Sequence, residues 1–244
     1  TVILSDTPIA EQIICAVDLG INTDAVCSIM KADGTILARK FIDFTSDKDR
    51  MIHAMNRTRR KQSKYGPKSA RGLWAYVKRL NEDRAKKISA AIVEFASQHS
   101  VDTIVMEHLD FKGCKKRGSK AQRLSMWNHG IIREKVEQKA HLLGIRIATI
   151  CAWKTSALAF DGSGSVTRDD NNNHALATFT TGKQYNCDLS ASYNIGARYF
   201  IRELLKSLPA TEESRVKAKV PDAGRRTSCT LSTLRALVKE LSAA

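Results

Sequence analysis

The sequence predicts an α/β protein with one mixed sheet and flanking helices. Short apolar segments with strand character come first along the chain, and further ones then alternate with long segments of helical period. In addition, 43% of the 244 residues are apolar, which is enough to bury one sizeable core. We find no internal repeat at the scale of about 20–50 residues. One main domain is therefore expected.

Residues 13–21, 25–31 and 35–44 are predicted to be three strands. Each is rich in apolar residues, and Ala32-Asp33-Gly34 between the last two supplies the turn chemistry of a hairpin. An antiparallel meander is the simplest pairing for three such strands.

Residues 47–98 change to a helical period and are predicted to form two basic helices. The helices are separated near Tyr65-Gly66-Pro67, because proline excludes the residue before it from the helical conformation. The buried side of the second helix is expected to carry Leu73, Val77, Leu80, Ala91 and Phe95.

The second half of the chain continues with alternating strands and helices. Residues 102–107 and 145–150 are predicted to be buried strands, and residues 121–143 and 188–206 to be helices. Residues 161–186 lack a helical period and are expected to be rich in loops, with room for one hairpin.

This order of elements matches the ribonuclease H-like fold, in which a three-strand meander feeds two parallel strands and helices pack on the faces of the sheet. We assign residues 1–206 to this domain, with a basic helical insertion at 48–98 and a second insertion at 151–187. Residues 207–244 are expected to be a polar, basic tail in which a last short helix covers 230–242.

Positive charge is concentrated in one segment. The net charge of the chain is +15, and residues 48–87 alone hold fourteen Lys or Arg against three acids. Such a concentrated field favours a polyanionic partner, whose binding weakens with salt because counterions are released. The alternative is a solvated helical face. Tyr65, Trp74 and Tyr76 lie among the charges, where they could stack on bases or equally form the inward side of the helices.

Three acids lie where a carboxylate is locally costly. Asp18 interrupts an apolar strand, Glu107 ends the run IVME, and Asp188 opens the last long helix. A buried carboxylate needs a hydrogen bond, a cation or a metal. In the proposed fold the first and fourth strands are adjacent and the last helix starts beside them. We therefore expect the three side chains to converge.

Each acid alone has a simpler interpretation. Asp18 in a DLG loop also fits an ATP clamp, Glu107 fits a solvent-facing strand end, and Asp188 fits a helix cap. Together they favour two-metal hydrolysis of a phosphodiester, because Mg²⁺ prefers carboxylate ligands and no side-chain nucleophile is then required.

Three segments resemble a known family. DLGINT (18–23), IVMEHLDFK (104–112) and CDLSASYNIGARY (187–199) resemble the three RuvC motifs of the TnpB (OrfB) proteins of insertion sequences and of the related type V CRISPR effectors. The basic helical pair also resembles the one that this family places between its first and second motifs. The third motif is the most specific, and the match spans about 18–205 of the chain.

The resemblance implies an RNA-guided DNA endonuclease with a RuvC-like site, whose partners are a guide RNA and a target DNA. Asp18, Glu107 and Asp188 are then the catalytic acids and the ligands of two Mg²⁺ or Mn²⁺ ions. Asn194 is expected to help position the site. The residues expected to bind nucleic acid are Arg57, Arg59, Arg60, Lys61, Lys64, Lys68, Arg71, Lys78, Arg79 and Arg168. Arg168 is expected to contact a substrate phosphate; the alternative is that it is an ordinary charged residue of a loop.

The chain departs from the family in two ways. The family often carries a zinc ribbon with two CxxC pairs before its third motif, whereas this stretch offers only Cys151 and Cys187, so we expect no structural zinc. The segments that would grip the guide and the target-adjacent motif are also missing, and the chain opens on Thr rather than Met. We expect an N-terminal segment or a separate chain to supply them.

Three rival functions stay open. An ATP clamp needs a second phosphate loop, which DGSG at 161–164 imitates poorly. A nuclease-silent, RNA-guided regulator would be expected to lack one of the three acids, and a transposon DNA-strand transferase would use similar metal chemistry. The chain has no apolar run of 18 residues and no signal peptide at its start, so it is expected in the cytoplasm of a prokaryotic cell.

Overall fold

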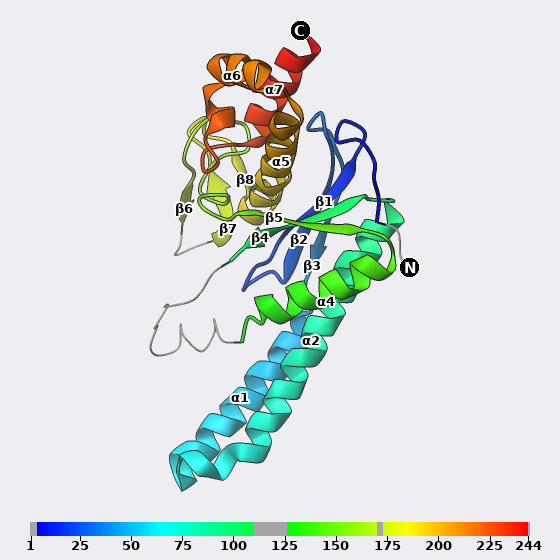
Figure 1. Ribbon diagram of the computed structural model, residues 1–244. Coiled ribbons are helices and arrows are strands. Elements are labelled where there is room, and N and C mark those ends of the chain that lie inside the picture. The colour runs from blue at the N-terminus through cyan, green and yellow to red at the C-terminus, as the bar shows by residue number, and fades with distance from the viewer. Residues whose placement is uncertain (1–3, 110–125, 170–172, 244) are drawn as a thin grey trace.

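The computed structural model describes residues 4–109, 126–169 and 173–243. Figure 1 shows a central sheet with helices on both of its faces and a long helical hairpin that projects away from it.

The main sheet has five strands in the order β3-β2-β1-β4-β5. These are β1 (Ile13–Asp18), β2 (Ala25–Lys31), β3 (Ile36–Ile42), β4 (Thr103–His108) and β5 (Arg146–Cys151). The first three pair antiparallel, whereas β4 pairs parallel with both β1 and β5. This is the ribonuclease H-like arrangement, and it confirms the predicted fold class.

The central strands read as continuous apolar runs because both faces of the sheet are covered. Along β1, Ile14 and Ala16 face one core, while Cys15 and Val17 face the other. The first core is closed by α5 (Cys187–Ser207). The second is closed by the helices that precede and follow β4.

Those two helices are α2 (Arg71–Gln98) and α4 (His129–Leu142). Of the side predicted for α2, Val77 and Phe95 are buried, and Leu73, Leu80 and Ala91 are half-buried. The helix predicted at 121–143 is found as α4, and its first five predicted residues lie outside the described part of the chain.

The predicted basic insertion is a helical hairpin. α1 (Thr45–Tyr65) ends where expected, before Gly66, the 3-10 helix η1 (Pro67–Ala70) makes the turn, and α2 returns toward the sheet. Met51, Ala54 and Val77 form a small core of their own between the two helices. We call α1, η1 and the part of α2 paired with α1 the arm.

Two regions contain more structure than the sequence analysis predicted. In place of one hairpin, the segment before α5 forms a second, three-stranded antiparallel sheet of β6 (Thr167–Asp169), β7 (Asn173–Thr178) and β8 (Gln184–Asn186). The expected tail contains the predicted last helix, α7 (Leu231–Ser242), and also α6 (Ala210–Lys219) and the 3-10 helix η2 (Pro221–Gly224).

These C-terminal helices are packed rather than extended. Val216 of α6 and Leu231, Leu234 and Leu237 of α7 are buried in the same core as α5. The domain boundary placed at 206/207 stays a prediction, although the two sides of it share this core.

Within the described ranges, no helix is both long enough and apolar enough to cross a membrane.

Gly196 lets α5 approach the sheet closely. A Cβ atom at this position would lie 2.9 Å from Met30 Cε and 3.2 Å from Ala16 Cβ. The spacing between α5 and strands β1 and β2 therefore depends on a residue without a side chain, and so does the position of the acid at the start of α5.

We expect Gly196→Ala to lower the free energy of unfolding by about 1–3 kcal/mol, because an extra methyl group in a packed core forces its neighbours to shift. Gly130→Ala is the matched control: a Cβ there meets nothing within 4 Å, so the change should be neutral or slightly stabilising. Urea unfolding of the two variants measures both values, and equal stabilities would contradict the close approach.

Candidate active site

The three predicted acids line one cleft. The cleft has a volume of about 540 Å³, and Asp18, Glu107 and Asp188 all contribute to its wall. The other lining residues are Leu19, Gly20, Ile21, Asn22, Thr23, Trp127, Thr155, Ser156, Arg168 and Ala175. The fold thus brings together side chains that are up to 170 positions apart in the sequence.

Strand register places the first two acids. In the parallel pair of β1 and β4, Val17 is opposite Met106, so Asp18 and Glu107 follow at the same edge of the sheet. Both strands end there, at their C-terminal ends, which is where open α/β sheets generally bind ligands.

Asp188 comes from the first turn of α5. The cap of this helix is Asn186, whose side chain accepts a hydrogen bond from Leu189 N at 2.9 Å. The alternative in which Asp188 itself caps the helix is therefore wrong. Because Asn186 satisfies the helix end, the Asp188 carboxylate is left to line the cleft beside the positive end of the helix dipole.

Gly20 is required by the turn that follows Asp18. A Cβ atom at Gly20 would lie 2.5 Å from Thr23 O, which is too close for any side chain. The turn keeps residues 19–23 folded back as one wall of the cleft. We call these residues the cleft loop.

Burial has the largest effect on the electrostatics of the acids in the cleft. Burial raises the pKa of the Asp18 carboxyl well above its ordinary value, and the charges of Glu107 and Asp188 raise it further, against an opposing effect of Arg168. Burial also raises the pKa of Glu107, although the Thr155 hydroxyl and Arg198 act in the other direction. Burial therefore disfavours the ionised form of both carboxyls, and for Asp18 the neighbouring acids add to this effect.

Glu107 is held by a network that the sequence analysis missed. Thr155 donates a hydrogen bond from its hydroxyl to Glu107 Oε1, and Thr155 is itself buried. Asn194 donates from Nδ2 to the carbonyl oxygens of Thr155 and Leu158, both at 2.9 Å, and accepts from Leu231 N. Asn194 therefore contacts the loop that carries Thr155, and the positioning role expected for it stays a prediction.

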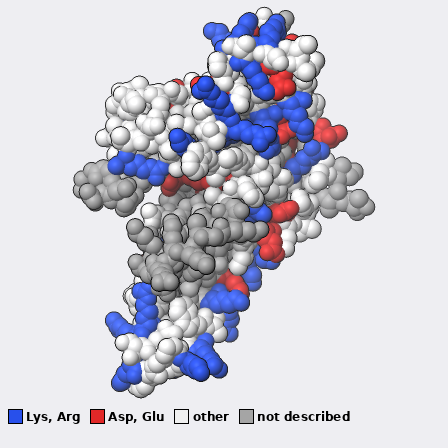
Figure 2. Space-filling model, turned by 60° about the vertical axis from the view of Figure 1, so that its left-hand side comes forward, with Lys and Arg blue, Asp and Glu red and all other residues white. Residues whose placement is uncertain are grey.

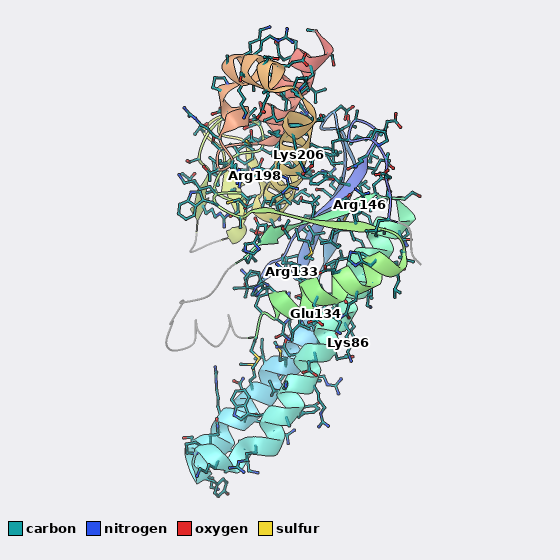
Figure 3. The ribbon with its side chains drawn as sticks, viewed as in Figure 1. Lys86, Arg133, Glu134, Arg146, Arg198 and Lys206 are labelled. Carbon is teal, nitrogen blue, oxygen red and sulfur yellow. The ribbon has the colours of Figure 1, made fainter. Side chains whose placement is uncertain are left out.

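Arg198 anchors the same loop from one turn further along α5. Its guanidinium donates to Cys151 O at 2.9 Å and to Trp153 O at 2.8 Å, and also to Thr227 O and Cys229 O. Figure 3 labels it on α5. A charged residue four positions after Asn194 on the apolar side of a helix was a signal available in the sequence, whereas nothing marked Thr155 within its polar loop.

The donor chemistry of the cleft fits a hard divalent cation. Three carboxylates supply the oxygen ligands that Mg²⁺ or Mn²⁺ prefers, and such an ion would relieve the repulsion that raises the pKa of Asp18. In the part of the chain that the structure describes, no three His, Cys, Asp or Glu side chains are already grouped as a metal cage. Mg²⁺ keeps several waters and is usually bound through one or two carboxylates, so a preformed cage is not required.

The residues predicted to bind nucleic acid lie in two parts of the structure. Arg168 is exposed and lines the cleft, and its Nη2 donates to Ser156 O at 2.6 Å. The other nine are all exposed on the arm, at Arg57, Arg59, Arg60, Lys61, Lys64, Lys68, Arg71, Lys78 and Arg79. Figure 2 shows Lys and Arg gathered at the free end of the arm.

Not every charge or aromatic residue of this segment faces solvent. Arg84 is buried and pairs with Asp24, so it does not contribute to the exposed basic surface. Trp74 and Tyr76 pack against the small core of the arm, as in the inward alternative, whereas Tyr65 is 64% exposed at the tip.

No protein-family model matches the chain, and no curated protein matches it in sequence. Solved structures share its fold: a Cas12f1–sgRNA–target DNA complex (21% identity, TM-score 0.59), a CRISPR-Cas12f ternary complex (19%, 0.55) and an AacC2c1–sgRNA binary complex (11%, 0.57). Each match covers 78% of this chain. The chain spans 51%, 40% and 39% of those proteins, respectively.

The raised pKa of Asp18 has a consequence for stability. The folded state holds the Asp18 proton more tightly than the unfolded state does, so stability falls as pH rises from the ordinary carboxyl pKa of about 4 through the raised value. Without divalent ions, Asp18→Asn should therefore raise Tm at neutral pH, by about 2–4 °C per kcal/mol gained, and the gain should disappear toward pH about 4. Thermal unfolding at several pH values in EDTA tests this, with the exposed Glu94→Gln as control. A gain that grows as pH falls would contradict it.

Proposed function

We propose that this chain is the nuclease part of an RNA-guided, metal-dependent DNA endonuclease related to TnpB and the type V CRISPR effectors. One observation carries the proposal: acids from β1, β4 and α5 line a single cleft that Arg168 also lines, in a protein with an exposed basic arm. The shared fold with Cas12 proteins supports it.

Asp18, Glu107 and Asp188 would hold one or two Mg²⁺ or Mn²⁺ ions in this function. Such ions, when bound, activate a water molecule and neutralise charge on a scissile phosphate. Neighbouring residues of the chain position these carboxylates. Thr155 fixes the Glu107 carboxylate, and Asn186 frees Asp188 from capping the helix.

Arg168 is proposed to contact a substrate phosphate. Its guanidinium has five N–H donors, and Ser156 O takes one bond from it, which orients the group at the cleft. A planar donor fork suits a phosphate better than a point charge does.

Guide RNA and target DNA are the proposed partners. The three similar structures contain an sgRNA or are described as ternary complexes, and in this chain the nine exposed Lys and Arg of the arm supply a surface for such polyanions. Because the chain spans about half or less of those proteins, we propose that further residues or another chain select the target. The arm and the cleft then contribute backbone binding and cleavage.

Cleavage of a labelled single-stranded DNA with Mg²⁺ or Mn²⁺, in the presence of any RNA that co-purifies, tests the nuclease assignment. Asp18→Asn and Glu107→Gln should each lower the single-turnover rate by about 10²–10³-fold, because each removes a carboxylate that holds the metal. Glu94→Gln, an exposed acid on α2, should cleave like the wild type. Equal activity in the wild type and all three variants would contradict the nuclease assignment. RNA-dependent binding without cleavage would favour the regulator, and joined products the strand transferase.

The arm should account for much of the salt dependence of nucleic-acid binding. The triple variant Arg60→Gln, Lys61→Gln, Lys64→Gln should weaken binding and flatten the plot of log affinity against log salt by about 0.7–0.9 for each phosphate that the arm no longer neutralises. Fluorescence anisotropy between low and moderate salt measures the slope. Lys206→Gln, an exposed charge on α5, is the control and should leave the slope nearly unchanged. An unchanged slope in the triple variant would rule out the arm as the binding surface.

A further inference from the structure

A buried ion cluster joins the cleft loop to the base of the arm. Asp24 directly follows the cleft loop, and its side chain is fully buried. One carboxylate oxygen pairs with Arg84 of α2 and, at 3.3 Å, with Lys48 of α1, while the other accepts a hydrogen bond from Phe44 N at 2.9 Å. A single carboxylate thus contacts both helices of the arm and the residue before α1.

Lys48 also contacts the cleft loop itself. Its ammonium donates to the backbone oxygen of Asn22 and to the carboxylate of Asp43, besides its pairing with Asp24. The ammonium thus makes two hydrogen bonds and one further ion pair with these three partners. Asn22 lines the cleft, so the first turn of α1 is tied directly to a wall of the candidate site.

The cleft loop depends on these ties. The ladder between β1 and β2 runs up to the pairing of Asp18 with Val26, so the loop lies beyond it. Gly20 sets its tight turn. With its side chain only 15% exposed, Lys48 is screened from solvent far more than an ordinary surface lysine, which strengthens each of its charged contacts.

We infer that Lys48 is a positioning residue, which holds the cleft loop against the base of the arm and so fixes the wall of the cleft beside Asp18. It acts through Asn22 and Asp24 and does not itself line the cleft. The inference rests on the proposed function only in so far as this cleft is the site of cleavage. The contacts of Lys48 with the cleft loop do not depend on whether the protein cleaves DNA.

Hydrogen–deuterium exchange of the peptide that covers 19–24 tests the tie without requiring activity. Lys48→Met keeps most of the stem but removes all three polar contacts. It should speed exchange in this peptide about tenfold, as expected when charged hydrogen bonds that hold a local segment are removed. Lys78→Met is the matched control on α2. That lysine is 78% exposed, it pairs with Glu82 at 3.8 Å, and its replacement should leave the peptide unchanged.

Kinetics separate positioning from binding. With the cleavage assay above, Lys48→Met should lower the single-turnover rate at saturating DNA about tenfold with nearly unchanged affinity, whereas Lys206→Met, at an exposed position of α5, should keep both the rate and the affinity. Lys48→Arg, which preserves the charge, should recover part of the rate and of the slow exchange.

Wild-type exchange at 19–24 in Lys48→Met would overturn the inference. If Lys48→Met does not fold, Asp43→Asn decides instead, because Asp43 is a more exposed partner of Lys48 whose removal should speed exchange at 19–24 by a smaller factor. No change in that variant would also overturn the tie. If no variant cleaves DNA but exchange responds as expected, the proposed function fails and the tie stands.

Discussion

The central constraint on this fold is that it places three carboxylates, Asp18, Glu107 and Asp188, in the wall of one partly desolvated cleft. Asp18 shows the strain of this arrangement, because burial and the charges of Glu107 and Asp188 all disfavour its ionised form. A buried carboxylate at the end of an apolar strand is costly unless polar groups or a cation stabilise it. The surrounding polar contacts include the Thr155 hydroxyl, which donates to Glu107, and the cap at Asn186, which leaves Asp188 free of that role; a bound cation would relieve the remaining repulsion.

Helices on the two faces of the sheet contribute different parts of the structure around the cleft. On one face, α5 approaches closely at Gly196, delivers Asp188, and fixes the neighbouring loop through Asn194 and Arg198. On the other face, α2 and α4 complete the second core, and α2 continues into the arm. Figure 3 labels Arg198 on the first side, away from Lys86 of α2.

Elements with strong local signals could be predicted from the sequence. The strands of the main sheet, the break at Pro67 and the long helix from 187 follow from apolar period and turn chemistry. That the three acids line one cleft could be expected once the strand order was predicted. The network around Thr155 could not be predicted, since it depends on which polar residue of a loop meets Glu107 across 48 positions. β6 and β8, with three residues each, are too short to stand out, and α6 is too charged.

The arm has one further consequence, which concerns how such a molecule can change. Its own small core at Met51, Ala54 and Val77 is separate from the two cores that flank the sheet, and Figure 1 shows its tip far from the sheet. Lengthening or shortening the hairpin by whole turns, about 3.6 residues on each helix, would alter its reach without shifting Asp18. The length of the arm and the geometry of the cleft can therefore change independently of each other.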